Sequence, residues 1–570
     1  MSNALPPSLL QTLAQVLAQL DGQSYRNYRQ IKGRHEFNGC TLHFDRIQSD
    51  PYAPPSQCRV IVPQTVAQFD PALYQGRIRA MALRDYLTRQ FDQAIQAVGQ
   101  PKALQILRPG QVILERSCCW IDATQVEVRF RLNLPAVGRR IAGKQAVKLI
   151  CQQFPEVVAQ SLIATAFDPA AVAQHVETAE NADYLRSQLQ PQGLIAFVAD
   201  DAVLARRSGI DDRPDPQAIA FRSPDSLRVQ LQLADQSAIS GMGIPAGITL
   251  IVGGGYHGKS TLLRAIERGI YNHIPGDGRE YVVTAPTAVK IRAEDGRCIH
   301  DADLSALINH LPLGRSSTKF STENASGSTS QAANMVESVA AGAQVLLLDE
   351  DTCATNLMVR DARMQRLIAP EHEPITPLID QVQPLQQQYG VSTIMVMGGC
   401  GDYLAVADRV IAMQEFLPRD VTELAQAIVQ DCPNPRAIAA SQIFGPLPQR
   451  QIDCRLLTPT HPTKPHRGKI QADQKIQFYQ QEVDLGLVEQ LVESGQLKTL
   501  AAIIVAIHQG WFETQITTQT PDLSQLLQVF EQLFENAQGL DQLTQERSGD
   551  LVQVRVIELA AALNRLRDRR

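Results

Sequence analysis

ITLIVGGGYHGKSTLL, residues 248–263, places an apolar strand, a glycine-rich turn and a helix in direct succession. Within it, Gly253–Ser260 fits the phosphate-loop pattern G-x-x-x-x-G-K-[ST]. The glycines of such a loop let backbone N–H groups surround a phosphate at the positive end of a helix dipole. A plain glycine-rich turn is the alternative, but the strand before the loop and the helix after it favour a nucleotide site in an α/β fold.

Each part of the predicted loop has a role. Lys259 is expected to neutralise the β- and γ-phosphates of ATP, and the Ser260 hydroxyl to ligate Mg²⁺. His257 either contacts the γ-phosphate or serves only as a spacer whose backbone matters. The predicted ATP-binding residues are Gly253, Gly254, Gly255, Tyr256, His257, Gly258, Lys259, Ser260 and Thr261.

A second short apolar strand, VLLL at 345–348, ends in the carboxylates of Asp349 and Glu350. At the C-terminal edge of a parallel sheet, Asp349 is placed to hold Mg²⁺ together with Ser260. Glu350 is placed to accept a proton from the attacking water, so Glu350 and Lys259 are the predicted catalytic residues. The alternative is a solvated acidic turn after a core strand.

The chain divides by sequence texture into three predicted domains. Residues 1–170 mix helices with half-buried strands, as an α+β accessory domain does. Residues 171–445 alternate short apolar strands with helices, which is typical of a parallel sheet covered on both faces. Residues 446–570 begin as a Pro-rich linker arm and continue as a small helical domain.

Two of these regions predict particular elements. In 124–133 the apolar residues alternate with polar ones, which indicates a strand with one face in a core and Arg129 and Arg131 on the polar face. In the last region we expect amphipathic helices within 485–507, 522–537 and 551–570.

Residues 323–356 resemble the part of ABC-class ATPases in which an LSGGQ signature opens a helix that leads to the Walker B strand. Ala325–Thr329 falls on the signature, and Asp349–Asn356 falls on DEPTSALD. Backbone amides at a helix N-terminus form an anion site, and the resemblance implies that this one grips the γ-phosphate bound to the other subunit. A flexible Ser/Gly-rich loop is the alternative. The implied residues are Ser326, Gly327, Ser328 and Thr329 for the signature, and Thr355 and Asn356 for the D-loop.

The sequence departs from the ABC pattern at several positions. Ser328 and Thr329 replace a glycine and the glutamine of the signature, and Asp351 and Asn356 replace the proline and aspartate after Walker B. The Mg²⁺-sensing glutamine is unassigned, with Glu294 or Asp295 as possible substitutes. Where ABC proteins carry a switch histidine, this chain reads GGCGD at 398–402.

Longer strings resemble one subfamily more closely. GGGYHGKSTLL, IYNHIPGDGRE, IRAEDGR, DEDTCATN, EPITPLID and GCGDYL look like the predicted ABC-class ATPase family that includes RNA-editing-associated, pore-forming members, and so do SDPYAPPS and LPAVGRRIAGK nearer the N-terminus. The resemblance implies a P-loop ABC-type ATPase core with an α+β N-terminal domain and a small helical C-terminal domain. It also implies a homodimer with two composite ATP sites and binding of RNA or another nucleic acid.

The number of motifs in the chain also indicates a dimer. The chain carries one phosphate loop and one signature candidate, so a signature that acts across an interface needs two copies related by C₂ symmetry.

Residues 129–148 carry six cations and no acidic residue in a chain of formal net charge −6. Such a basic run suits phosphate backbones without implying base readout, although a solvated charged face explains it equally well. Its residues are Arg129, Arg131, Arg139, Arg140, Lys144 and Lys148.

Composition narrows the class of protein further. The chain is 44% hydrophobic and 20% charged, as globular proteins are, and no run of eighteen apolar residues occurs. With no secretory signal and ten scattered cysteines, we expect a cytoplasmic protein without a membrane domain. Besides an ATPase, two functions stay open: a P-loop kinase of a small molecule, and an interaction protein that binds ATP with little turnover.

Overall fold

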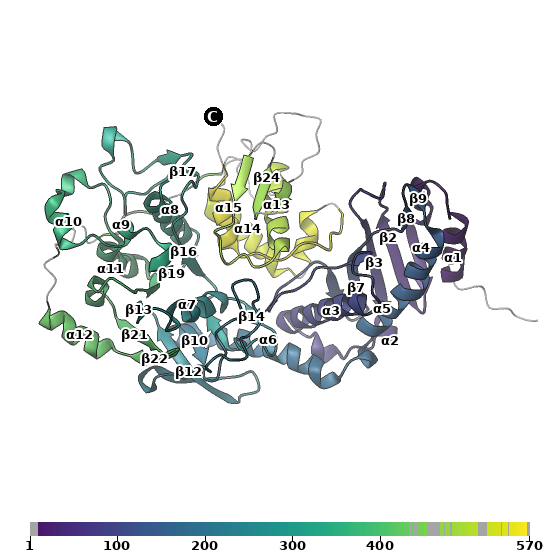
Figure 1. Cartoon of the computed structure of the whole chain (residues 1–570), viewed down its shortest axis with the longest axis horizontal. Coiled ribbons are helices and arrows are strands. Elements are labelled where there is room, and N and C mark those ends of the chain that lie inside the picture. Colours follow the sequence, from purple (N-terminus) through teal and green to yellow (C-terminus); the bar gives the residue numbers. More distant parts are fainter. Residues whose placement is uncertain are drawn as a thin grey trace, which may run out of the picture. The chain divides into compact units, whose positions relative to one another are not determined.

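A computed structural model of the chain divides into two compact units (Figure 1). The first comprises the described parts of Met1–Glu180 and Ala537–Gln553, and the second those of Asn181–Asn536 and Val554–Arg570. The predicted division into three domains stays a prediction. The structure describes residues 9–432, 436, 443–447, 450–452, 468–471, 474–478, 481–510, 521–536, 538–544 and 546–566.

The first unit is built on an antiparallel sheet whose strands run in the order β1-β2-β3-β7-β4, with β6 also paired to β7. Strand β3 alternates buried and half-buried residues, the period that a sheet with one core face requires. The strands are β1 (Gly33–Phe37), β2 (Cys40–Arg46), β3 (Ser56–Pro63), β4 (Leu104–Gln105), β6 (Cys119–Ile121) and β7 (Gln125–Leu132).

Helix α3 (Arg77–Ala97) packs on this sheet (Figure 1). Leu83, Leu87, Phe91 and Ile95 recur every fourth residue, so they form one stripe, and all four are fully buried. The Phe91 ring contacts that of Phe130 on β7. The unit also contains α1 (Leu9–Gln19), α2 (Gln64–Ala67), β8 (Ala136–Val137), β9 (Arg140–Ile141), α4 (Gly143–Val147), α5 (Phe154–Ser161) and the first part of α6 (Pro169–Leu189).

Strand β7 is not half-buried, as its alternation predicted, because a segment from the far end of the chain covers its polar face. Glu127 and Arg129 are 2% and 6% exposed. Arg129 and Arg131 form ion pairs with Asp541 and Asp550, both in the segment 538–553. The sequence pattern identified the two faces of the strand correctly but gave no sign of this second layer.

The second unit contains the predicted parallel sheet, with strands in the order β16-β19-β20-β13-β21-β22. All neighbours are parallel except β21 and β22, which form a hairpin at one edge. The strands are short, and the three formed by the runs ITLIV, VLLL and STIMV are almost entirely buried, as those runs indicated. They are β13 (Ile248–Val252), β16 (Ala288–Ile291), β19 (Val345–Asp349), β20 (Ser392–Val396), β21 (Arg409–Gln414) and β22 (Leu417–Asp420).

Helix α7 (Lys259–Arg268) lies between this sheet and a second, antiparallel one. The second sheet has the order β11-β12-β10-β15, formed by β10 (Leu194–Ala199), β11 (Arg228–Gln232), β12 (Ala238–Pro245) and β15 (Val282–Thr284). Leu262, Leu263 and Ile266 of α7 are buried, so the helix that follows the phosphate loop is fixed on both sides. Its N-terminus therefore has a defined position relative to both sheets.

Further helices cover the parallel sheet. Helices α8 (Gly327–Ala340) and α11 (Leu378–Tyr389) contribute Val336, Val382 and Leu385 to one buried core with Leu346 and Leu348 of β19. The remaining elements here are β14 (Asn272–His273), β17 (Ile299–Ala302), β18 (Phe320–Thr322), α9 (Thr355–Met358), α10 (Ala362–Leu367) and α12 (Thr422–Asp431).

The C-terminal region contains helices, as predicted, but also a small sheet that the sequence did not indicate. Strands β23 (Gly468–Gln471), β24 (Lys475–Phe478) and β25 (Gln481–Asp484) form antiparallel pairs. The first expected helix begins only at Ser494, and the helices are α13 (Ser494–His508), α14 (Leu523–Glu535) and α15 (Val556–Asn564). Residues 453–467, within the Pro-rich linker arm predicted at about 446–480, lie outside the described residues. Within the described ranges, no helix combines the length and apolar character that crossing a membrane requires.

Candidate functional site

The glycine-rich loop joins β13 to α7, as the sequence predicted. Gly253 has φ +137°, and a Cβ at this position would lie 2.5 Å from the Met413 carbonyl oxygen on β21. Only glycine fits both the backbone conformation and this close approach. Gly258 has φ +93° and caps the helix that begins at Lys259.

The outer part of the loop is open to solvent. Gly254, Gly255 and Tyr256 are exposed, and nothing lies within 4 Å of a Cβ built on Gly255. Tyr256 has φ +64°, a left-handed conformation that costs a non-glycine residue on the order of 1–3 kcal/mol. Its side chain is fully exposed, so packing within this chain does not account for the tyrosine at this position.

Lys259 extends back along the loop. Its Nζ donates hydrogen bonds to the carbonyl oxygens of Gly253 and Gly254, both at 2.8 Å. The ammonium group thus lies over the open face of the loop, at the N-terminus of α7, where unpaired backbone N–H groups accumulate. An anionic phosphate fits this arrangement of a cation, a helix N-terminus and open glycines.

His257 is fixed by the hairpin between β21 and β22. Its Nδ1 accepts a hydrogen bond from the Glu415 N–H at 2.9 Å, and its carbonyl oxygen accepts one from Phe416. Glu415 and Phe416 both have positive φ, as the two central residues of a type I′ hairpin turn do. The ring therefore ties the phosphate loop to this turn, which the sequence interpretation did not anticipate.

Asp349 ends strand β19, two strands away from β13 in the sheet. The residue is 7% exposed, and its Oδ1 accepts a hydrogen bond from the Asp351 N–H at 3.3 Å. Mg²⁺ prefers oxygen ligands and takes one or two carboxylates together with substrate phosphates and water. The hydroxyl of Ser260 and the carboxylate of Asp349 both offer oxygen ligands, so the predicted metal ligands suit Mg²⁺ chemically.

Glu350 is held by a backbone contact that the sequence did not indicate. Its Oε2 accepts hydrogen bonds from the N–H groups of Gly398 and Gly399 at 2.5 and 3.0 Å. A Cβ on Gly398 would lie 3.7 Å from Glu350 Oε2 and 3.9 Å from Lys259 Nζ. The two predicted catalytic residues are therefore neighbours across the end of β20.

The predicted signature residues stand at the N-terminus of α8. Ser326 is the exposed N-cap, and its Oγ lies 3.0 Å from Thr329 Oγ1 and 3.3 Å from Ser328 Oγ. Ser328 is buried, whereas Gly327 and Thr329 are half-exposed. Gly327 is tightly surrounded, since a Cβ there would lie 3.2 Å from Asp295 Oδ1.

The D-loop residues adjoin the same helix. Gln331 of α8 is fully buried, and its Oε1 accepts a hydrogen bond from the Ala354 N–H at 2.7 Å. Thr355 and Asn356 follow at the start of α9 and are exposed. The Gln331–Ala354 hydrogen bond thus joins the signature helix to the segment after Walker B.

Glu294, one of the two residues considered as a substitute for the Mg²⁺-sensing glutamine, is paired with other side chains of the fold. Its Oε1 pairs with Arg565 Nη2 at 2.6 Å and accepts a hydrogen bond from Asn334 at 3.0 Å. It follows β16, which is separated from β13 by β19 and β20. Its role is to fix α15 against α8. Asp295, the other substitute considered, is exposed beside Gly327.

Comparison with known families agrees with this geometry. A family model described as a P-loop domain, of the ABC ATPases, matches residues 168–450. A second, described as the N-terminal part of ATPases of the ABC class, matches residues 10–165. The chain belongs to the ABC-class ATPase family. A third model, described as the MRB1590 C-terminal domain, matches residues 468–570 of this ABC-class ATPase.

Individual relatives are more distant. The uncharacterized protein MJ1628 of Methanocaldococcus jannaschii is 29% identical over 246 residues, which are 41% of this chain and 53% of that protein. The chain thus spans about half the length of this curated relative. A solved structure, the ADP conformation of MJ1267, an ATP-binding cassette of an ABC transporter, is 11% identical with a TM-score of 0.25 and covers 42% of this chain and 96% of its own.

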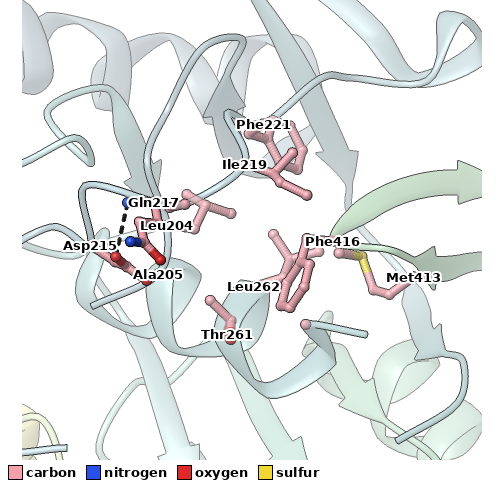
Figure 2. Close-up of a pocket in the computed structure, with 12 residues that line it drawn as sticks. Leu204, Ala205, Asp215, Gln217, Ile219, Phe221, Thr261, Leu262, Met413 and Phe416 are labelled. Atoms are coloured by element: carbon pink, nitrogen blue, oxygen red, sulfur yellow. Dashed lines mark hydrogen bonds between the residues drawn. The ribbon is translucent and has the colours of Figure 1, made fainter. Parts of the chain in front are cut away.

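A pocket of about 210 Å³ adjoins the phosphate loop of this ABC-class ATPase (Figure 2). Figure 2 shows Thr261 and Leu262 of α7 on one side and Phe416 and Met413 of the hairpin on another. The loop between β10 and β11 supplies the remaining wall, with Leu204, Ala205, Asp215, Gln217, Ala218, Ile219 and Phe221. Only Thr261 and Gly258 among these were predicted site residues, because no motif marks 204–221.

The cysteines beside the site are poorly suited to act as nucleophiles. Burial raises the pKa of the Cys353 thiol to about 12, and burial likewise raises the pKa of Cys400. Both thiols therefore stay protonated at neutral pH, and a protonated thiol is a weak nucleophile.

The predicted basic run separates into two groups. Arg129 is buried between Glu127 and Asp541, and Arg131 pairs with Asp550. The other four cations are exposed, although Arg139 lies 3.6 Å from Asp50. The exposed group is Arg139, Arg140, Lys144 and Lys148.

Proposed function

We propose that this ABC-class ATPase binds ATP with Mg²⁺ and hydrolyses it. The observation that carries the proposal is the approach of three strand ends, those of β13, β19 and β20, which bring Lys259, Glu350 and the Gly398 amide together. A cation for the phosphates and a carboxylate for the attacking water are the two groups that phosphoryl transfer to water needs.

The residues divide the work as follows. The loop amides and Lys259 bind the β- and γ-phosphates and neutralise charge that develops in the transition state. Glu350 orients a water molecule and accepts its proton while the water oxygen forms a bond to the γ-phosphorus and the bond to the β-phosphate oxygen breaks. Ser260 and Asp349 would hold Mg²⁺, which supplies further neutralisation of phosphate charge when bound.

The pocket in Figure 2 is suited to the nucleobase. Its walls are mainly apolar, with the aromatic rings of Phe221 and Phe416, and polar groups are few, as in most sites for flat ring ligands. It adjoins Gly258 and Thr261, so a base there and a triphosphate on the loop belong to one ligand.

We further propose a homodimer with composite sites. The α8 N-terminus presents Ser326 to solvent, and within the described part of the chain the Ser326 hydroxyl bonds to Ser328 and Thr329 of the same helix rather than to the phosphate loop. The exposed Thr355 and Asn356 beside it extend the same surface. A second copy offers each phosphate loop such a helix N-terminus under C₂ symmetry.

A role in binding RNA or another nucleic acid rests on the exposed part of the basic run. Arg139, Arg140, Lys144 and Lys148 are close in sequence and exposed, so they suit a phosphate backbone. Arg129 and Arg131 are paired with carboxylates and do not support this role.

Glu350→Gln tests the hydrolytic assignment. The amide cannot accept the proton, so we expect turnover of ATP to fall by roughly 10²–10⁴-fold while nucleotide binding persists. Asp351→Asn changes a neighbouring exposed carboxylate in the same way and serves as the matched control. Normal hydrolysis by Glu350→Gln would show that Glu350 is not the base.

Glu350→Gln, together with Ser326→Arg, also tests the dimer and the kinase alternative. Glu350→Gln with ATP should elute as a dimer in size-exclusion chromatography, and Ser326→Arg should abolish both that dimer and acceptor-free hydrolysis. A monomer that turns over ATP only when a small-molecule acceptor is added would instead identify a P-loop kinase. Tight nucleotide binding with no turnover by the wild type would favour an interaction protein.

A further inference from the structure

Two successive backbone amides converge on one carboxylate oxygen at the end of β20. The N–H groups of Gly398 and Gly399, which we call the amide pair, both donate to Glu350 Oε2. Both glycines are exposed, so these amides have access to solvent and to a ligand. Consecutive N–H groups that point to one centre form an anion-binding concavity, and here the anion is the chain's own side chain.

The amide pair lies within reach of the phosphate-binding lysine. A Cβ on Gly398 would be 3.9 Å from Lys259 Nζ. Among the residues that the structure describes, this lysine donates hydrogen bonds only to the carbonyl oxygens of Gly253 and Gly254. An oxygen of a γ-phosphate held by Lys259 is therefore expected close to the same two amides. Charge-assisted hydrogen bonds to such an oxygen resemble those to a carboxylate in length and strength.

We propose that the amide pair of Gly398 and Gly399 is a γ-phosphate site that Glu350 occupies in the absence of nucleotide. In this arrangement the Glu350 carboxylate stands in for a phosphate oxygen, and its Oε2 is engaged by the two amides. Arrival of the γ-phosphate displaces it, because two anions cannot share the same two donors without strong repulsion. The displaced Glu350 is then free to accept a proton from the attacking water.

This inference rests on the proposed function, since it requires a nucleotide on the phosphate loop. It also predicts that the amide pair distinguishes ATP from ADP. The γ-phosphate of ATP reaches the two amides, whereas ADP has no γ-phosphate. After β20, where ABC proteins carry a switch histidine, this chain has GGCGD. Backbone amides would take the place of that histidine side chain. The contact uses only the backbone N–H groups of residues 398 and 399, and a Cβ at 399 would lie 3.2 Å from Glu350 Oε1.

Amide hydrogen exchange at residues 398 and 399, resolved by mass spectrometry, tests the proposal without relying on activity. In the wild type without nucleotide, both amides should exchange slowly although they are exposed. Glu350→Ala should accelerate them by about tenfold or more, the factor that follows from losing a hydrogen bond to a charged group. In Glu350→Ala, a non-hydrolysable ATP analogue should restore slow exchange, and ADP should not.

Matched variants separate this effect from general changes. Glu531→Ala removes an exposed carboxylate on α14 and should exchange like the wild type at 398 and 399. Glu350→Gln keeps the shape of the side chain but accepts hydrogen bonds more weakly, so exchange should accelerate by a smaller factor than in Glu350→Ala. Unchanged exchange in both Glu350 variants would overturn the contact itself.

Nucleotide binding, measured by calorimetry on the same samples, separates a failure of the amide-pair proposal from a failure of the ATPase proposal. If both ADP and the analogue bind to Glu350→Ala but leave exchange at 398 and 399 equally fast, the amide pair is not a γ-phosphate site and the ATPase proposal stands. If neither nucleotide binds to the wild type, the ATPase proposal fails and the inference fails with it.

Discussion

The phosphate loop and strand β7 both carry cations that the sequence marked as ligands for phosphate, yet the structure treats them differently. The ammonium of Lys259 contacts only the carbonyl oxygens of its own loop among the recorded contacts of the described residues. The guanidinium groups of Arg129 and Arg131 are neutralised by Asp541 and Asp550. The first cation is available to a ligand, and the other two belong to the fold.

The difference shows which kinds of site a local pattern can predict. The phosphate loop, its strand and its helix are contiguous, so sixteen residues of sequence contain the whole arrangement. The availability of an arginine depends on whether a distant carboxylate returns to it, and Asp541 is more than four hundred residues from Arg129. A charge run therefore predicts a binding surface only after the tertiary contacts are known.

The largest expected effect tests whether Arg129 stabilises the fold. Arg129→Ala would leave Asp541 without its bidentate partner, whereas Glu127 would keep Arg59 and Arg547, both at 3.3 Å, so we expect the unfolding free energy to fall by about 3 kcal/mol. Chemical denaturation of the full chain measures the loss. Arg34→Ala, at an exposed arginine of the same unit, should change stability by less than about 0.5 kcal/mol. A loss that small for Arg129→Ala would show that its ion pairs with Glu127 and Asp541 do not stabilise the fold.

The next effect tests whether Lys259 acts on the ligand rather than on stability. Lys259→Ala removes the charge that we propose binds phosphate, so ATP turnover should fall by about 10²–10³-fold, while the thermal unfolding temperature should stay close to that of the wild type. Lys290→Ala, at a half-buried lysine of β16, is the control for loss of a lysine from the same sheet. A large drop in stability without loss of turnover would reverse the roles of the two regions.

A pH effect sharpens the comparison within the first unit. Burial raises the pKa of Asp85, but the charges of Arg89 and Arg116 and the contact with His175 outweigh it and lower the pKa well below its usual value. A depressed folded-state pKa stabilises the protein above the unfolded-state pKa near 4, and this is lost as pH falls from about 5 towards 2. We expect a contribution of about 2–3 kcal/mol, measured as the difference in pH dependence of unfolding between the wild type and Asp85→Asn. Parallel curves for the two proteins would contradict it.

The smallest expected effect concerns the exposed end of the basic run. The double variant Arg139→Glu and Arg140→Glu should leave stability within about 0.5 kcal/mol but weaken RNA binding and reduce the salt dependence of affinity by about two in log–log slope. Fluorescence anisotropy at several salt concentrations provides the measurement. Lys32→Glu with Arg34→Glu is the control with the same change in charge. Equal binding by the two double variants would remove residues 139 and 140 from the proposed interface.

Much of the fold could be predicted from local patterns. Short apolar runs gave the parallel strands, and the glycine loop gave the junction of β13 and α7. The small sheet β23–β25 was missed because Pro- and Gln-rich sequence carries no clear strand period. The start of α13 at Ser494 was also missed, since the apolar residues from 485 onwards continue the helical spacing without forming a helix.

For the site, the sequence by itself determined the phosphate loop, the carboxylates after β19 and the N-terminus of α8, because each lies within one continuous stretch whose chemistry depends on nearest neighbours. Only the tertiary structure decided that Glu350 rests on the Gly398 and Gly399 amides, that His257 holds the Glu415 turn, and that Arg129 is buried in an ion pair. These contacts join segments that are far apart in sequence. Their partners are set by how sheets and helices pack, which no local spacing records.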